Sequence, residues 1–328
     1  MSAAGAACDV GYSLAEEQDF QQVLNLCSRD DYSGLDYMAA TFHRWLQEPG
    51  RLVFIAKMNS RVVALESALL VDGGHTVVFQ GFRVAPDLRG SGIAGGLQEH
   101  VTNYIRGHYP EVSVVRHSRG DQPSAESLAK YRLIAKEAIL SLCCEAADLG
   151  PFIAELRSRL PRQTQSSPHG PVILTQPQAE TLILSNHVVY DLLPGKTIIN
   201  NWEPLKPMEA NLEVLRRRGL TWIVDHEVDP SVVSLSTPPY AVPYRHDALH
   251  FNINIFGHSL ISVCTVFLAQ LEALLPSLRG YLIVYTHVDP QIWPGLRQFC
   301  QNKANVSFFK AYCEDVVLES DLRCTSAL

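Results

Sequence analysis

The chain has 328 residues, of which 47% are hydrophobic and 19% are charged, a composition typical of a globular protein with about two domains. The formal net charge of -7 argues against a general nucleic-acid or anionic-membrane binder, because such proteins need a basic face. No apolar run reaches the roughly 18 residues of a membrane-spanning helix, and the first residues lack the pattern of a signal peptide. We therefore expect a cytoplasmic protein.

The eight cysteines do not indicate a metal or redox site, because none of them is in a C-x-x-C spacing. In a chain of this size they are typical of buried thiols in a reducing compartment. His246 and His250 are four residues apart, but they lie in a strand-like stretch with no glutamate beside His246. This excludes a zincin-type motif, and we expect no metal.

The first part of the chain predicts two helices and a three-stranded antiparallel meander. A short strand is expected over 8–12, and Ser13 with Glu16 has the capping-box spacing that predicts a helix over 14–27. A second short helix is expected over about 36–46. The strands of the meander follow over 52–57, 61–71 and 76–85, joined by turns at 59–60 and 72–74.

A glycine-rich stretch after the third meander strand leads into an amphipathic helix that ends near His108, with Ile93, Leu97 and Val101 at helical spacing. A strand over 112–116, a helix over 124–136 and a strand over 139–145 complete the first half. Residues 157–170 are rich in proline and serine and are expected to be a linker. The predicted domains are therefore 1–156 and 171–328.

The second half repeats a similar order of elements. Its predicted helices cover about 207–218, 260–275 and 291–301, and its strands cover 220–227, 231–236, 249–255, 281–287 and 306–313. We interpret this as a duplication of fold without duplication of sequence. The expected fold class is α+β, with mostly antiparallel sheet and flanking helices in both halves.

The segment from Phe82 to Ala94 (FRVAPDLRGSGIA) carries the clearest chemistry. It is a strand that runs through a glycine-rich turn into a helix, and free backbone N–H groups at a helix N-terminus bind phosphate. Glycine lets the backbone approach a ligand closely, and Arg89 adds a positive charge. The turn lacks a P-loop motif, and it does not follow the first strand of a dinucleotide-binding unit. The pyrophosphate of coenzyme A is the natural remaining ligand.

This segment resembles the acetyl-CoA motif [R/Q]-x-x-G-x-[G/A] of the GCN5-related N-acetyltransferase (GNAT) superfamily, with Arg89, Gly92 and Ala94 in the motif positions. The resemblance implies acetyl-CoA as cosubstrate. It implies that the backbone of Val84 and Ala85 binds the pantetheine arm. It also implies that the pyrophosphate is held by the loop residues Arg89, Gly90, Ser91, Gly92, Ile93 and Ala94.

The same resemblance implies that Tyr131, which follows Lys130 in the predicted helix over 124–136, protonates the leaving thiolate. The alternative is a half-buried core tyrosine. Acetylation of an amine also needs a proton acceptor, and Glu66 is the candidate, since it interrupts the apolar strand 62–70. The alternative for Glu66 is an ordinary strand residue on the solvent face.

A small amino-acid acceptor needs a cation for its carboxylate and polar or aromatic groups for its side chain. The candidates are Asp36 and Tyr37 on the early helical segment and Arg116 after the late strand. For each of them taken singly, a surface or packing residue is the favoured interpretation. The second half has no counterpart of the glycine loop, because Gly257-His258-Ser259-Leu260 follows its corresponding strand. We therefore expect a degenerate GNAT-like domain there.

Four further segments resemble vertebrate histidine N-acetyltransferases and their relatives: Ser33-Gly34-Leu35-Asp36-Tyr37, Ala64-Leu65-Glu66-Ser67, Lys130-Tyr131-Arg132-Leu133-Ile134 and Gly195-Lys196-Thr197-Ile198-Ile199. This resemblance covers most of the chain and implies acetylation of the α-amino group of free L-histidine. The alternative acceptors are another small amine and a peptide or protein N-terminus. The alternative function is a non-catalytic acyl-CoA-binding scaffold. The sequence does not indicate an oligomeric state.

Overall fold

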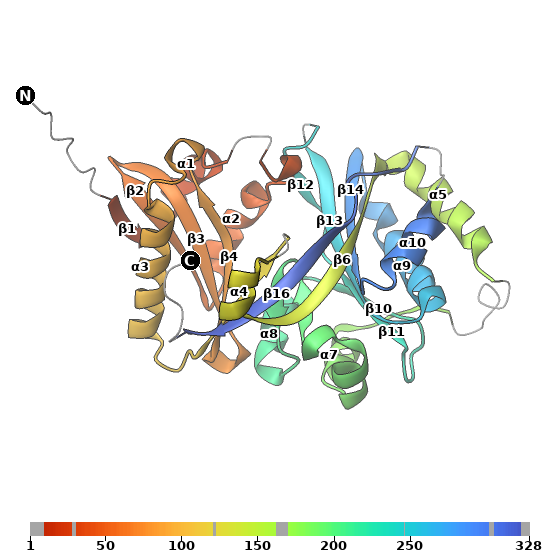
Figure 1. The fold of residues 1–328 in the computed structure, drawn as a ribbon. Helices are drawn as coiled ribbons and strands as arrows, with labels where there is room; N and C mark the ends of the chain where they lie inside the picture. Colours follow the sequence, from red (N-terminus) through yellow and green to blue (C-terminus); the bar gives the residue numbers. More distant parts are fainter. Residues whose placement is uncertain are drawn as a thin grey trace, which may run out of the picture. The chain divides into compact units, whose positions relative to one another are not determined.

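The computed structural model describes residues 10–27, 31–120, 123–161, 170–245, 247–301 and 305–322, which form two compact units (Figure 1). The first unit comprises Met1–Arg116 and Ser320–Leu328, and the second comprises His117–Glu319. These units have other bounds than the predicted domains 1–156 and 171–328, which a linker over 157–170 separates. Most of the predicted linker, and Cys8, His246 and Cys324, lie outside the described residues.

The first unit is an antiparallel sheet between two helical layers. Its strands β1 (Val10–Leu14), β2 (Arg51–Met58), β3 (Arg61–Val71) and β4 (Thr76–Val84) pair in that order, and β5 (Val114–Arg119) follows β4. Helix α3 (Ile93–His108) packs on one face, as Figure 1 shows. Helices α1 (Phe20–Leu24) and α2 (Met38–Gln47) pack on the other face around buried Phe42 and Trp45.

A β-bulge interrupts the β3–β4 pairing between Leu65 and Ser67. Leu65 lies opposite Arg83 and Ser67 opposite Gln80, so Glu66 faces an extra residue of β4. Gly81 in the bulge has a φ of 74°, and a Cβ there would lie 2.8 Å from the Trp45 ring. Only glycine therefore fits this position without displacing the core.

The meander was predicted closely, but two helices were placed wrongly. Ser13 belongs to β1, where it pairs with Ile55, and the first helical residues are the 3₁₀ turn Glu17–Asp19. The capping box forms between Glu16 and Asp19 instead. The helix predicted over 124–136 is the shorter α4 (Ala125–Lys130), because the β-ladder of β6 begins at Arg132.

The second unit contains a mixed sheet. Among the strand pairs whose register is described, one is parallel and the others are antiparallel. The order is β16 (Cys313–Asp321), β6 (Arg132–Glu145), β14 (Tyr281–Val288), β13 (Ala248–Gly257), β11 (Val232–Ser236), β10 (Thr221–Val224) and β7 (Val172–Ile173). Strands β13 and β14 are parallel. The smaller strands are β12 (Tyr240–Val242) and β15 (Ser307–Phe308) beside this sheet, and the separate pair β8 (Ile198–Asn200) and β9 (Glu203–Leu205).

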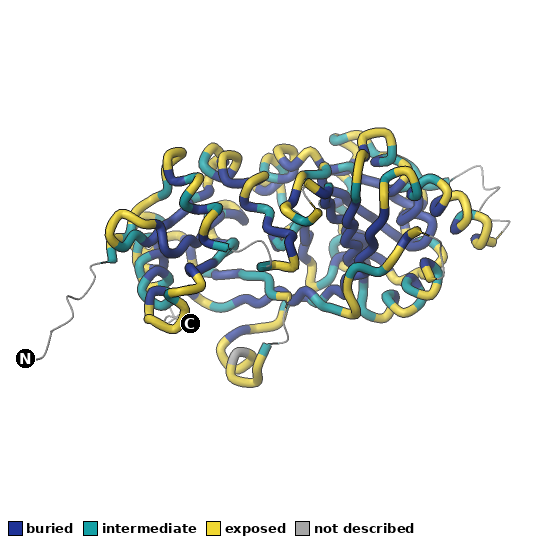
Figure 2. Tube along the Cα trace, turned by 90° about the horizontal axis from the view of Figure 1, so that it is seen from above, coloured by how far each residue is buried: buried dark blue, intermediate teal, exposed yellow. Residues whose placement is uncertain are grey.

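Helices α5 (Ala146–Arg159), α9 (Leu260–Leu274) and α10 (Trp293–Cys300) pack together in the main core of the second unit. The remaining helices are α7 (Gln176–Ile183) and α8 (Leu212–Arg217). Figure 2 shows buried residues in the interior of the tube and exposed residues along its outer turns and loops. The expected α+β class with mostly antiparallel strands is confirmed.

The segment Leu260–Ser277, which contains α9, is long and apolar enough by composition to cross a membrane, with a mean hydropathy of 1.7 over 18 residues. Half of this window is buried inside the protein, and Val263, Phe267 and Leu271 are completely buried in the core. Helix α9 is therefore buried against strands of its own unit, as a core helix of a globular domain is.

Candidate active site

The glycine-rich turn after β4 has the geometry of an anion-binding loop. Gly90 and Gly92 have φ values of 82° and 87°, which only glycine adopts at little cost. Gly92 is the N-cap of the 16-residue helix α3 and brings no side chain to satisfy the first-turn amides. The Ser91 hydroxyl donates to the carbonyl of Leu88 at 2.6 Å, which closes the turn. The free amides and the helix dipole together favour a phosphate group.

A pocket of about 310 Å³ opens beside this loop, wholly within the first unit. The Arg89 side chain on its rim is 55% exposed, and its guanidinium lies 3.6 Å from a carboxylate oxygen of Asp31. The residues that line the pocket are Tyr32, Phe82, Arg83, Val84, Leu88, Arg89, Gly90 and Ala94. The loop amides and the Arg89 charge fit the pyrophosphate of coenzyme A, and the pocket provides space beside them.

The two residues predicted to bind the pantetheine arm already make hydrogen bonds within the protein. The Ala85 N–H donates to the carbonyl of Val63 at 2.8 Å. The Val84 carbonyl accepts from Arg89 Nε at 3.4 Å. Val84 lines the pocket and Ala85 is completely buried behind it, so their roles toward the cofactor stay predictions.

A buried arginine forms the opposite wall of the pocket. Arg83 Nη1 lies 2.9 and 3.0 Å from the two carboxylate oxygens of Asp36, and its side chain is 1% exposed. Its Nη2 is buried and has no hydrogen-bond partner among the described residues. The guanidinium also lies 5.3 and 5.4 Å from the ring centres of Tyr32 and Tyr37. This wall therefore contains a buried guanidinium that is held by Asp36 and framed by two aromatic rings.

The sequence analysis missed Arg83, although it placed Asp36 and Tyr37 near the acceptor. The available signal was an arginine in a strand directly before the motif segment Val84-Ala85-Pro86. Arg116, the cation that was predicted instead, is 2% exposed and lies 2.9 Å from Asp72. Asp72 and Arg83 are at opposite ends of β4, so the structure does not bring Arg116 together with Asp36 and Tyr37.

Glu66 is not on the solvent face, which was the alternative considered for it. It is 2% exposed and faces the α3 side of the sheet, and burial raises its pKa to about 8 against the effect of a hydrogen bond with Gln98. Its Oε2 has no hydrogen-bond partner among the described residues. Glu66 is absent from the residues that line the pocket, so its role as a base stays a prediction.

Tyr131 belongs to the second unit and follows the end of α4 rather than lying within the helix. Its ring is 6% exposed, packs with Val316 and Leu318, and lies edge-on to His117 with ring centres 4.9 Å apart. Burial raises the pKa of its hydroxyl, which keeps it protonated at neutral pH. A protonated hydroxyl has the state required of a general acid, and the catalytic role stays a prediction.

The corresponding helix start in the second unit is built differently. Ser259 is the N-cap of α9, and its hydroxyl accepts from the Ser262 N–H at 3.4 Å. A side chain therefore occupies the position that Gly92 leaves open in α3. This agrees with the expected absence of a second glycine loop.

Comparison with known proteins identifies both halves. The acetyltransferase (GNAT) family model matches residues 18–129, and a model of the histidine N-acetyltransferase C-terminal region matches residues 167–289. A histidine N-acetyltransferase of Scomber australasicus is 36% identical over 317 residues, which cover 95% of this chain and 93% of the relative. The chain belongs to the histidine N-acetyltransferase family. A human relative named probable N-acetyltransferase 16 is 38% identical over 323 residues and is covered to 85%.

Solved structures show the same tandem architecture. A tandem GNAT protein from the clavulanic acid biosynthesis pathway aligns over 96% of this chain and 99% of its own, with a TM-score of 0.54 and 12% identity. An N-myristoyltransferase of Saccharomyces cerevisiae aligns over 94% of this chain and 78% of its own, with a TM-score of 0.56 and 12% identity. At these identities the likeness concerns the fold alone. It confirms a GNAT fold followed by a GNAT-like second half.

Proposed function

We propose that this member of the histidine N-acetyltransferase family transfers the acetyl group of acetyl-CoA to the α-amino group of free L-histidine. The products are N-α-acetyl-L-histidine and coenzyme A. The observation that carries the proposal is one pocket that joins the glycine loop at Gly90 to the buried guanidinium of Arg83. Relatives named for this activity, aligned along nearly the whole chain, support the same acceptor.

The glycine loop holds the acyl donor in this proposal. The first-turn amides of α3 and the Arg89 guanidinium bind the pyrophosphate, since both are cationic or partly positive and face the pocket. Acetyl-CoA brings an activated thioester. The protein contributes binding and orientation, which place the acetyl group next to the acceptor.

Arg83 binds the carboxylate of the amino-acid acceptor through Nη2. Its Nη1 is held by Asp36, so the guanidinium is already oriented before a ligand enters. A charge-assisted hydrogen bond from a buried donor contributes about 1.5–3 kcal/mol. A free amino acid gains this contact, whereas an acceptor without a carboxylate beside its amine does not.

The chemical step joins the acceptor nitrogen to the acetyl carbon and breaks the carbon–sulfur bond. The amine loses a proton and the leaving thiolate gains one, so the site needs a base and an acid. We assign the acid to Tyr131, which the raised hydroxyl pKa supports. Glu66 remains the candidate base, and its pKa of about 8 is near the operating pH of such a group.

Release of coenzyme A thiol from acetyl-CoA, measured with a panel of free amino acids, amines and peptides, tests the proposal. We expect turnover with L-histidine and much weaker turnover with histamine, which has the imidazole but no carboxylate. Comparable rates with peptides would show that the acceptor is a peptide N-terminus and not free L-histidine. Absence of turnover across the panel would overturn the enzymatic assignment in favour of a scaffold.

We also propose a cytoplasmic location. Six cysteines of the described residues, Cys27, Cys143, Cys144, Cys264, Cys300 and Cys313, are free thiols, which supports a reducing compartment. Fractionation of cells that express the tagged chain tests this proposal. Recovery in a membrane or secreted fraction would contradict it.

A further inference from the structure

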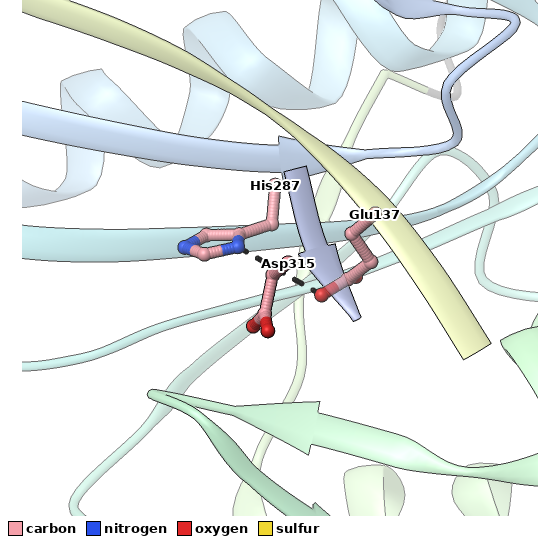
Figure 3. A group of neighbouring side chains, drawn as sticks. All are labelled: Glu137, His287 and Asp315. Atoms are coloured by element: carbon pink, nitrogen blue, oxygen red, sulfur yellow. Dashed lines mark ion pairs between the residues drawn. The ribbon is translucent and has the colours of Figure 1, made fainter. Parts of the chain in front are cut away.

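Three side chains that the proposed function does not use meet inside the second unit. Glu137 on β6, His287 on β14 and Asp315 on β16 project toward one another from neighbouring strands (Figure 3). One donor atom of each lies within 4.8 Å of the other two. Their exposed fractions are only 1–2%. Such a group has no access to bulk water for solvation of its charges.

Strand register explains why the three residues converge. Asp315 lies directly opposite Glu137 in the β16–β6 pair. His287 lies opposite Ile139, two residues along β6 from Glu137 and therefore on the same face. Asn254 on β13 continues the row, opposite His287. Two carboxylates directly opposite each other are destabilising unless a positive charge lies between them.

The hydrogen bonds of this row leave acceptors without donors. Asn254 Nδ2 donates to Glu137 Oε2 at 3.1 Å. Both carboxylate oxygens of Asp315 and the Nδ1 of His287 have no hydrogen-bond partner among the described residues. None of the ion pairs found in the described part of the chain brings a lysine or arginine to Glu137 or Asp315. The group therefore has a surplus of lone pairs over hydrogen-bond donors.

A second contact orients the imidazole as a ligand. Asn252 Nδ2 donates to Asn201 Oδ1 at 3.0 Å, which turns Asn252 Oδ1 toward His287 Nε2 at 3.3 Å. With Nε2–H donating to that oxygen, the lone pair of the neutral ring is on Nδ1. Nδ1 lies 3.8 Å from Glu137 Oε2, and Figure 3 shows the two atoms facing each other. An outer hydrogen bond that fixes the tautomer in this way is typical of metal-binding histidines.

We propose that Glu137, His287 and Asp315 bind a divalent transition-metal ion such as Zn²⁺ or Mn²⁺. One imidazole nitrogen and two carboxylate oxygens form a donor set that both ions accept. Donors that bind one ion at about 2.1 Å lie at most ~4.2 Å apart, so small side-chain rotations close the set. The ion neutralises two buried carboxylates and links three strands of the sheet. This inference is independent of the proposed function.

Metal uptake by the full-length chain tests the site directly. The purified protein is stripped with a chelator and titrated with MnCl₂ or ZnCl₂, with calorimetry, Mn²⁺ spin resonance and elemental analysis as readouts. We expect one ion per chain. Asp315→Asn and His287→Gln should each weaken binding by more than about 100-fold, and Asn252→Ala by about 10- to 100-fold.

The matched control is Asp191→Asn. Asp191 and Asp229 flank the exposed His187, so this group also combines one imidazole with two carboxylates, here in solvent-exposed positions. Metal binding by the Asp191→Asn variant should equal that of the parent chain. Asp315→Asn removes a buried like charge, so we expect its metal-free form to fold, which circular dichroism and thermal unfolding verify.

Failure of the parent chain to bind either ion would overturn the proposal, as would equal binding by Asp315→Asn. A third result would also overturn it: binding of L-histidine to the metal-free chain that Asp315→Asn abolishes. That result would show that these three side chains bind an organic cation and not a metal ion.

Discussion

Arg83 Nη1 lies 2.9 Å from one carboxylate oxygen of Asp36 and 3.0 Å from the other, while Nη2 of the same guanidinium has no hydrogen-bond partner among the described residues. Asp36 therefore holds one half of the guanidinium, and Arg83 lines the pocket. Under the proposed function, Arg83 distinguishes acceptors that have a carboxylate from acceptors that have none.

Arg83→Gln should raise the KM for L-histidine by about 10- to 100-fold, the equivalent of one charge-assisted hydrogen bond. The KM for histamine should change little, because histamine has no carboxylate. Steady-state kinetics with both acceptors gives the comparison, with Arg61→Gln as a control at an exposed ion pair with Asp87. Equal losses with both acceptors would show that Arg83 supports the fold alone.

Asp36→Ala should destabilise the protein by about 3–5 kcal/mol, because it leaves the buried Arg83 charge without its partner. Chemical denaturation with a two-state fit to the first transition measures this change. Asp36→Asn retains a hydrogen-bond acceptor and should lose less. A change below about 0.5 kcal/mol in both variants, the range of ordinary surface substitutions, would contradict the buried pair.

Arg89→Glu should weaken acetyl-CoA binding by more than about 100-fold, because it replaces a cation at the pyrophosphate with an anion. Stability should change little, since the side chain is 55% exposed. Calorimetric titration with acetyl-CoA measures the effect, and Arg61→Glu is the control for a general loss of positive charge. Unchanged affinity would remove Arg89 from the cofactor site.

Tyr131→Phe should lower kcat by about 100-fold, the lower range for loss of general acid catalysis. The KM values for both substrates should remain close to those of the parent, because the ring still packs with Val316 and Leu318. Single-turnover measurements separate the chemical step from product release. Full activity would leave Tyr131 as a core residue.

Glu66 should make stability decrease as pH rises. Its pKa is about 8 in the folded protein, against an ordinary value of 4.5 for a glutamate, so the folded state binds the extra proton between these two pH values. Stability is therefore lost between about pH 4.5 and 8. Glu66→Gln should equal the parent near pH 4 and exceed it by roughly 2–4 kcal/mol above pH 8. Parallel stability curves from pH 4 to 9 would contradict the buried, protonated carboxyl.

Local patterns predicted the first unit better than the second. The Asn59-Ser60 turn, with φ values of 51° and 65°, and the strand Arg61–Val71 follow directly from period-2 hydrophobicity and turn residues. Helix α3 covers Ile93–His108, as the helical spacing of Ile93, Leu97 and Val101 predicted. Helix α5 was missed because it contains Pro151, and β16 because its residues after Cys313 are largely acidic and polar.

Site prediction from sequence is possible where the chemistry is local and is not possible where it depends on strand register. The loop Arg89–Ala94 is one continuous segment, so its sequence was sufficient to propose a cofactor-binding loop. Arg83 pairs with Asp36 across 47 positions. Glu137, His287 and Asp315 meet through the register of three strands, and the sequence analysis expected no metal. Periodicity within one segment contains no information about such pairings.

The first unit is completed by the far end of the chain. Leu322 is 2% exposed in the core beneath α3, its N–H donates to the Ser113 carbonyl at 2.9 Å, and its carbonyl accepts from Arg106 Nη2 at 2.5 Å. During synthesis, the glycine loop emerges from the ribosome more than two hundred residues before Leu322 does. The nascent glycine loop therefore rests on an open core until translation is almost finished, and a release of the chain before Leu322 leaves that core exposed to chaperones and proteases.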